Sequence, residues 1–115
     1  KMLENMESFF NIPKGTSLHN INMVRGDASL GRIEIAQYVG WPGQSQRTIA
    51  VPPNTGILSI AMETDNLDAT MQLLTSIGTE PCSAAVEVRA PLLGNVRARS
   101  YYGPDDELLE FYQRI

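Results

Sequence analysis

The sequence predicts an α+β fold built mainly from strands, with one amphipathic helix in the second half of the chain. Three observations lead to this prediction. Apolar and polar residues alternate in several short segments, which is the pattern of half-buried strands. One helical pattern lies between two of these segments, bounded by a capping residue and a glycine. Residues 56–115 therefore predict the order β-α-β-β-β, and the preceding part predicts a helix and two strands.

The composition is that of a globular protein and excludes several functional classes. The chain has 115 residues, of which 43% are hydrophobic and 19% are charged. A net charge of -4 argues against nucleic-acid binding, which requires a basic surface. No apolar run approaches the roughly 18 residues of a membrane span, and the single cysteine, Cys82, excludes a disulfide scaffold and gives no sign of a catalytic thiol. We therefore expect a cytoplasmic protein that contacts neither nucleic acid nor membrane.

The first part of the chain predicts a short helix followed by a hairpin. The apolar residues on one face of a helix over residues 2–10 are Met2, Leu3, Met6, Phe9 and Phe10. Residues 18–24 and 32–39 alternate between apolar and polar, as strands do. Because a short turn segment separates them, we expect the two strands to pair antiparallel.

Residues 40–55 form the longest irregular stretch of the sequence. This stretch is rich in glycine and proline, and Trp41 lies within it. It exceeds an ordinary connection in length, so it is either a linker or a loop with a function. We interpret residues 41–55 as a linker between residues 1–40 and residues 56–115.

The second part of the chain predicts one strand, one helix and three further strands. The first strand covers residues 56–64, and Asp65 or Asn66 can cap a helix from Leu67 to Ile77 that Gly78 ends. The remaining strand segments are residues 84–89, 96–102 and 108–113. An apolar-Glu-apolar-x-Gln pattern occurs at residues 33–37 and again at 109–113, which indicates two related halves.

Several segments of the second part resemble a known family. They are Gly56-Ile57-Leu58-Ser59-Ile60-Ala61-Met62, Asp65-Asn66-Leu67-Asp68-Ala69, Gly78, and residues 101–113. In order and spacing they resemble the second βαβββ module of the vicinal oxygen chelate superfamily. That superfamily includes glyoxalase I, methylmalonyl-CoA epimerase, extradiol dioxygenases and the bleomycin- and fosfomycin-resistance proteins. The closing motif departs from the family at Gly103, Asp106 and Glu107, which stand where the family has Asp, Gly and Asn.

The resemblance covers residues 31–115 and implies a curled mixed sheet that forms a cup. Residues 56–115 would be a complete module, and residues 1–40 would be the remnant of another. The first strand, first helix and second strand of that first module have no counterpart in this sequence. A missing strand leaves an unpaired sheet edge. We therefore expect a homodimer or larger assembly, which buries the first helix and the hairpin.

The resemblance also implies a site in the cup. In the family, the first and last strands of each module supply ligands to a divalent metal. Glu34 and Glu110 fall on the last-strand positions of the two modules, and Ser59 stands where a His is usual. Because two carboxylates are fewer than the ligands of a stable transition-metal site, we expect no tightly bound cofactor. A divalent metal held weakly by Glu34 and Glu110 is the alternative.

Structural interpretations compete with these roles. Glu34 shares its strand face with polar neighbours and is also consistent with a surface residue, whereas Glu110 lies in a more apolar setting. Arg97 and Arg99 have more than one interpretation. They could lie near the two glutamates and relieve the repulsion between them, or bind an anionic substrate. They could equally be solvated charges on the outer face of the sheet. His19, the single histidine, is not at a ligand position.

Three functions remain open from the sequence. The first is a cup without a complete metal site that binds a small organic molecule, as bleomycin-resistance proteins do. Its lining candidates are Tyr38, Trp41, Tyr101, Tyr102 and Tyr112. The second is a glyoxalase-like or epimerase-like metal-dependent lyase or isomerase, with Glu34 or Glu110 as ligand or general base. The third is a truncated module that mainly pairs with itself. Ser59 in place of His favours the first function over the second.

Overall fold

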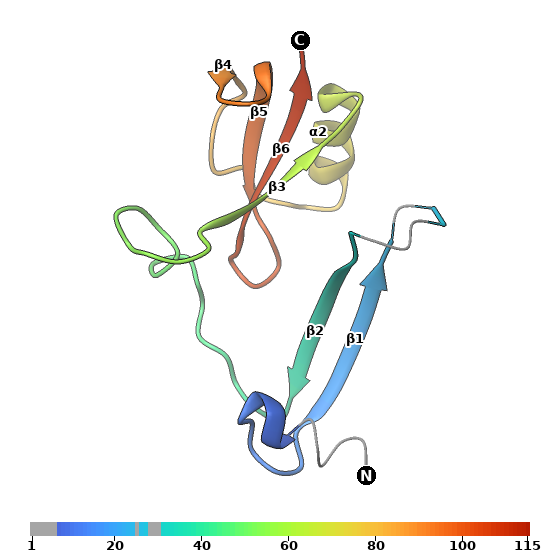
Figure 1. The fold of residues 1–115 in the computed structure, drawn as a ribbon, viewed down its shortest axis with the longest axis vertical. Coiled ribbons are helices and arrows are strands. Elements are labelled where there is room, and N and C mark those ends of the chain that lie inside the picture. The colour runs from blue at the N-terminus through green and yellow to red at the C-terminus, as the bar shows by residue number, and fades with distance from the viewer. Residues whose placement is uncertain (1–6, 25, 28–30) are drawn as a thin grey trace. The chain divides into compact units, whose positions relative to one another are not determined.

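The structure is a computed structural model that describes residues 7–24, 26, 27 and 31–115. The chain divides into two compact units, residues 1–44 and 45–115, which we describe separately (Figure 1). Residues 45–55, most of the predicted linker, belong to the second unit. None of the helices in the described residues is long and apolar enough to span a membrane.

The first unit is a helical turn followed by a β-hairpin. Residues 7–10 are helical, as predicted, and Met2, Leu3 and Met6 of the predicted helix lie outside the described residues. The hairpin consists of β1 (Ser17–Met23) and β2 (Ile33–Val39). The two strands pair antiparallel along their full length, which confirms the predicted hairpin.

One face of this hairpin is apolar and exposed. Its five apolar side chains are between 37% and 66% exposed; they are Ile21, Met23, Ile33, Ile35 and Val39. We call these residues the hairpin apolar face. A two-stranded hairpin is at best marginally stable by itself in water. A surface that covers these side chains would therefore stabilise the hairpin.

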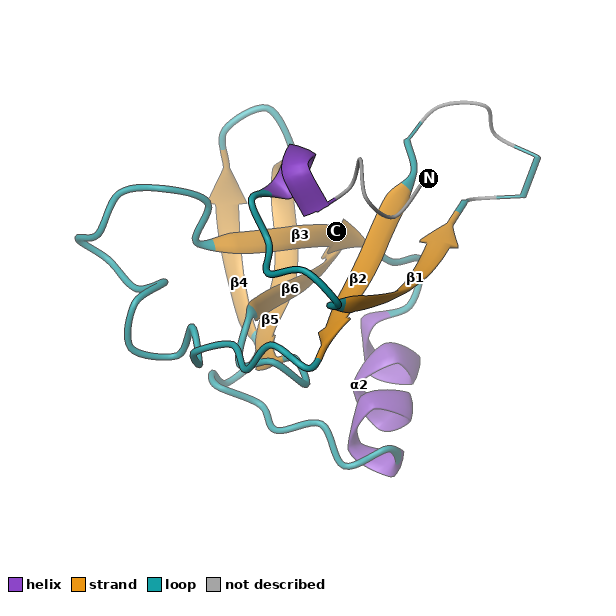
Figure 2. Ribbon diagram, turned by 90° about the horizontal axis from the view of Figure 1, so that it is seen from below, coloured by secondary structure: helices purple, strands orange, loops and turns teal. Residues whose placement is uncertain are grey.

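The second unit has the predicted β-α-β-β-β order. Its elements are β3 (Ser59–Glu63), α2 (Leu67–Ser76), β4 (Val86–Ala90), β5 (Gly94–Tyr102) and β6 (Leu108–Arg114). The strands form one sheet in the order β3-β6-β5-β4. β3 runs parallel to β6, and the other two pairs are antiparallel. The sheet is therefore mixed, as the family resemblance implied, and α2 lies beside it (Figures 1 and 2).

Local contacts fix both ends of α2. The Asn66 side chain accepts a hydrogen bond from the Ala69 amide at 3.0 Å, which caps the first turn. The Leu67 amide donates to the side-chain oxygen of Gln113 at 2.9 Å, which ties the helix start to β6. Gly78 follows the helix with φ of 78°, where glycine is favoured. The predicted cap and stop are confirmed.

Strand pairing separates the sheet of the second unit into two faces. Alternate residues of a strand point to opposite sides, and paired residues point to the same side. The face next to α2 carries Arg97, which forms an ion pair with Asp68 of α2 at 2.9 Å. The opposite face, which we call the far face, consists of Ser59, Ala61, Glu63, Val86, Val88, Ala90, Val96, Ala98, Ser100, Tyr102, Leu108, Glu110, Tyr112 and Arg114.

The described core is small. Leu67 and Tyr101 are fully buried, and Val96 on the far face is 3% exposed. The Tyr101 ring lies 6.0 Å from the Phe111 ring in an edge-to-face arrangement, and the Arg99 guanidinium lies 5.4 Å from its centre. Tyr101 and Leu67 are therefore the largest fully buried side chains among the described residues.

The third predicted strand begins later than expected. The sequence predicted a strand over residues 56–64, but β3 begins at Ser59. Gly56 has φ of 130°, a conformation rare for other residues, and Ile57 is 89% exposed. The backbone thus departs from the extended form at Gly56, and Ile57 does not share a strand face with Ser59.

Candidate functional site

Glu110 lies near the middle of β6 on the far face. Its direct neighbours across the two adjacent strands are Ala61 of β3 and Ser100 of β5. Glu110 is half-buried, yet within the described residues its carboxylate has no hydrogen-bond or ion-pair partner. Both neighbours have small side chains, and Ala61 is exposed.

Aromatic side chains flank Glu110 on the same face. Tyr112 lies two residues further along β6, and Tyr102 pairs with Leu108 two residues before Glu110. The Tyr112 hydroxyl donates to Glu63 Oε2 at 3.3 Å, and Arg114 Nε donates to Glu63 Oε1 at 2.8 Å. The hydrogen bond to Glu63 raises the pKa of the Arg114 guanidinium. Glu63 is therefore neutralised by Arg114.

Ser59 also lies on this face. It pairs with Leu108, which precedes Glu110 by two residues on the same side of β6. The structure therefore places Ser59 and Glu110 on the same face of neighbouring strands. Ser59 is half-buried, as Glu110 is.

Tyr101, Arg97 and Arg99 lie on the other face of the sheet. Tyr101 pairs with Leu109, and Arg99 pairs with Phe111. The prediction that Tyr101 lines a pocket with Tyr112 is wrong, because Tyr101 is fully buried on the α2 side. The prediction that Arg97 or Arg99 offsets Glu110 is also wrong.

The two arginines have other partners on the α2 side. Arg97 binds Asp68, and Arg99 Nε donates to the Ser83 carbonyl at 3.0 Å. A second Arg99 nitrogen lies 3.6 Å from the Met71 sulfur. Both arginines therefore connect the sheet to α2 and to the segment that precedes β4.

The first unit contains the other predicted site residues. Glu34 accepts a hydrogen bond from the Asn20 side chain at 2.7 Å, on the hairpin face opposite the hairpin apolar face. The Tyr38 and Trp41 rings lie 6.1 Å apart, edge to face, and His19 is exposed and pairs with Gln37. Glu34 and Glu110 belong to different units, so a cup that contains both stays a prediction.

Sequence reasoning missed a polar cluster centred on Arg47. Arg47 Nε donates to Asp106 Oδ1 at 2.9 Å, and one of its terminal nitrogens donates to Glu80 at 3.2 Å. Its guanidinium also lies 4.0 Å from the centre of the Tyr102 ring. These contacts attach the start of the predicted linker to the second unit, beside Tyr102 of the far face.

Asp106 holds this cluster from a left-handed backbone position. Its φ is 65°, which explains why glycine is usual at this place in the motif that the sequence resembles. The Ser45 hydroxyl donates to Asp106 Oδ2, and this hydrogen bond, together with the nearby Arg47 charge, lowers the pKa of the Asp106 carboxyl. The presence of Asp106 where the motif usually has glycine was the one signal in the sequence for its contact with Ser45 and Arg47.

We expect acid to release residues 45–55 from the second unit. The pKa of Asp106 is lower in the folded protein than its ordinary value of about 3.9. The ionised Asp106 therefore stabilises the fold at pH values above about 3.9, and this stabilisation is lost as the pH falls through the pKa of the folded state. The protection of the Ile49 and Ala50 amides from hydrogen exchange, measured relative to the intrinsic exchange rate at each pH, should therefore fall below about pH 4. Asp106→Asn, which tolerates the left-handed backbone, should reproduce the faster exchange at neutral pH. Unchanged exchange in this variant would contradict the anchor.

Comparison with solved structures identifies the fold. A glyoxalase family protein from Bacillus cereus matches this chain with a TM-score of 0.75 and 18% sequence identity. The match covers 97% of this chain and 71% of the other. The chain has a vicinal oxygen chelate fold of the glyoxalase type. This confirms the fold class that the sequence predicted.

Other comparisons agree or find nothing. A structure described as a conserved domain protein matches the glyoxalase-type fold of this chain with a TM-score of 0.51 and 16% identity. That match covers 97% of this chain and 85% of the other. No protein-family model and no curated protein matches the chain. At these identities the likeness establishes the fold, and the chemistry has to be argued from the site.

The donor set does not fit the divalent metal that the glyoxalase-type fold often holds. Within residues 7–24, 26, 27 and 31–115, no group of three or more His, Cys, Asp or Glu side chains could hold a metal ion. The predicted donors on the far face are Glu110 and Ser59, and a neutral serine hydroxyl is a poor ligand for a transition metal. The other carboxylate of this face, Glu63, is paired with Arg114. We therefore derive no step of chemistry through a metal.

Proposed function

We propose that this chain binds a small organic molecule on the far face of its second unit, without a complete metal site. One observation carries the proposal: Glu110 is a half-buried carboxylate without a partner in the described residues, set between Ala61 and Ser100. Its oxygens can accept hydrogen bonds from a ligand, and hydrogen bonds to a carboxylate are among the stronger ones in proteins.

The surroundings of Glu110 favour an aromatic ligand that carries an ammonium group. The ammonium group supplies the charge-assisted hydrogen bond that the carboxylate lacks. Tyr102 and Tyr112 offer ring surface on the same face, and aromatic rings pack well against one another. Arg47 already contacts the Tyr102 ring, so we place the aromatic part of the ligand toward Tyr112 and the ammonium group at Glu110.

Tryptamine and tryptophol test this proposal, because they differ in the ammonium group and share the indole ring. We expect ligand-observed NMR to show binding of tryptamine and binding at least about tenfold weaker for tryptophol. Glu110→Gln removes the charge with little change in shape and should reduce tryptamine affinity by about tenfold. Asp65→Asn, an equivalent change at an exposed position, should have no effect. Equal binding of tryptamine by Glu110→Gln and the unmodified protein would refute the role of Glu110.

The alternative function is a metal-dependent lyase or isomerase of the glyoxalase type. It is favoured by the two carboxylates, Glu34 and Glu110, that stand at the matching positions of the two halves. Calorimetric titration with Zn²⁺, Ni²⁺ and Mn²⁺ distinguishes the two functions. We expect weak binding or none; a stoichiometric site that survives dialysis against a weak chelator would favour the enzyme.

We also propose that the chain works as a homodimer in the cytoplasm. The hairpin apolar face supports self-association, because its five side chains are at least 37% exposed, and Phe9 in the preceding helical turn is 80% exposed. The lone Cys82 is compatible with a reducing compartment. Light scattering that shows a stable monomer at micromolar concentration would contradict the dimer.

A further inference from the structure

β4 is an edge strand of the second unit. It pairs with β5 on one side and with no strand on the other within the described part of the chain. An edge strand presents a row of unpaired backbone groups that can pair with another strand. Its side chains therefore decide which strand it accepts.

The side chains of β4 divide into an apolar and a charged set. Val86 and Val88 point to the far face and are 49% and 48% exposed. Glu87 and Arg89 point to the other face, and both are exposed. Neither charge forms an ion pair or a side-chain hydrogen bond within the described residues. The strand thus offers one acidic and one basic group, two positions apart, along an unpaired edge.

This charge pattern selects one register when β4 pairs with itself. When two identical strands pair antiparallel with two-fold symmetry, the axis passes between one residue and the same residue of the partner strand. We name each register by that central residue. Centred on Val88, the pairing places Glu87 opposite the partner's Arg89, and the same contact occurs twice. Centred on Glu87 or on Arg89, it places like charges directly opposite one another, which is destabilising. Two favourable charge pairs therefore arise in the Val88-centred register alone.

We propose that β4 forms a two-fold symmetric contact with β4 of a second copy of this chain, antiparallel and centred on Val88. The contact joins the two four-stranded sheets into one continuous sheet. It goes beyond the homodimer proposed above, because it uses the other unit of the chain and a different surface, so chains that make both contacts assemble beyond a dimer.

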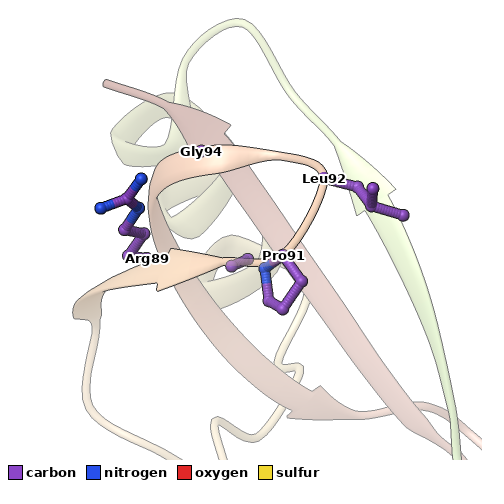
Figure 3. Close-up of a pocket in the computed structure, with 5 residues that line it drawn as sticks. Arg89, Pro91, Leu92 and Gly94 are labelled. Atoms are coloured by element: carbon purple, nitrogen blue, oxygen red, sulfur yellow. The ribbon is translucent and has the colours of Figure 1, made fainter.

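The turn after β4 supplies further contact area. Arg89, Ala90, Pro91, Leu92 and Gly94 line an open pocket of about 490 Å³. Figure 3 shows the Leu92 side chain projecting from this turn, and the Arg89 side chain pointing away from it. In the Val88-centred register, the partner's Val86 lies opposite Ala90 at the rim of this pocket. Leu92, which follows Ala90 by two residues, is fully exposed and offers apolar surface beside this part of the contact.

Charge reversal tests the contact and its register. In sedimentation-velocity experiments at low salt, Glu87→Arg alone and Arg89→Glu alone should each weaken self-association about tenfold, since each creates two like-charge pairs. An equimolar mixture of the two variants should form a heterodimer, because every pair in it is again opposite in charge. The double variant E87R/R89E should associate as the unmodified protein does. Single variants that associate normally, or a mixture without recovery, would overturn the proposal.

Cross-linking provides a second test, which reports the register of the contact directly. In the Cys82→Ser background, Val88→Cys places two cysteines opposite each other, and mild oxidation should give a covalent dimer. Glu87→Cys alone should cross-link more slowly, since its opposite residue is the partner's Arg89. Equal rates at both positions would overturn the register. If the unmodified protein associates but none of these variants changes its association or cross-linking, the β4 contact is wrong and the hairpin dimer remains possible. If the unmodified protein is a monomer, both proposals are wrong.

Discussion

Leu67→Ala should lower the free energy of unfolding of the second unit by about 3–4 kcal/mol. Leu67 is fully buried at the first position of α2, and truncation of a buried leucine removes transfer free energy and leaves a cavity. Neighbouring side chains usually relax into such a cavity only in part, so we expect a loss in the middle of the range for leucine truncation. The loss is a large part of the stability of a domain of this size.

Urea denaturation followed by circular dichroism measures this loss. Leu73→Ala in the same helix is the matched control, because Leu73 is 62% exposed. It should change the free energy of unfolding by less than about 1 kcal/mol, since alanine favours a helix and little burial is lost. Equal effects of the two substitutions would contradict the packing of α2 through Leu67.

Tyr101→Ala and Tyr101→Phe should have very different effects on the same free energy. Tyr101→Ala removes a fully buried ring in contact with Phe111 and should cost about 3–5 kcal/mol. The Tyr101 hydroxyl is buried and has no hydrogen-bond partner in the described residues. Tyr101→Phe should therefore leave stability unchanged or increase it by up to about 1 kcal/mol.

The same urea titrations test this pair. The Arg99 contact with the ring is retained in Tyr101→Phe, because phenylalanine keeps the ring face. A loss of more than about 1 kcal/mol in Tyr101→Phe would show that the hydroxyl is hydrogen-bonded, for example to a buried water. That result would revise the account of the core and leave the far face unchanged.

The elements of the fold could be predicted from local sequence signals. Asn66 and Gly78 mark the ends of α2 because capping and left-handed termination depend on a few adjacent residues. The alternation in β1 predicted its apolar face correctly. The resemblance of residues 56–115 to a family module implied a glyoxalase-type fold, which the structural likeness confirms.

Other features depend on contacts that local patterns do not encode. Both faces of β5 carry polar and apolar residues, so its alternation did not show which face α2 covers. Tyr101 was consequently assigned to a pocket although it is buried. The contact between Arg47 and Asp106 joins residues 59 positions apart, and neither end has a periodic signal. The association of Glu34 with Glu110 is a contact of the same long-range kind and stays a prediction.

The role of the far face is tested most directly by the NMR contacts of a bound ligand. On each side of the sheet, methyl groups are available as reporters: Ala61 and Ala98 on the far face, and Leu67 and Met71 on the α2 side. With the same sub-saturating concentration of tryptamine added to each protein, we predict intermolecular nuclear Overhauser effects to Ala61 and Ala98 that are much weaker in Glu110→Gln. Effects to Leu67 or Met71 instead, or effects of equal intensity in Glu110→Gln, would contradict the proposed site.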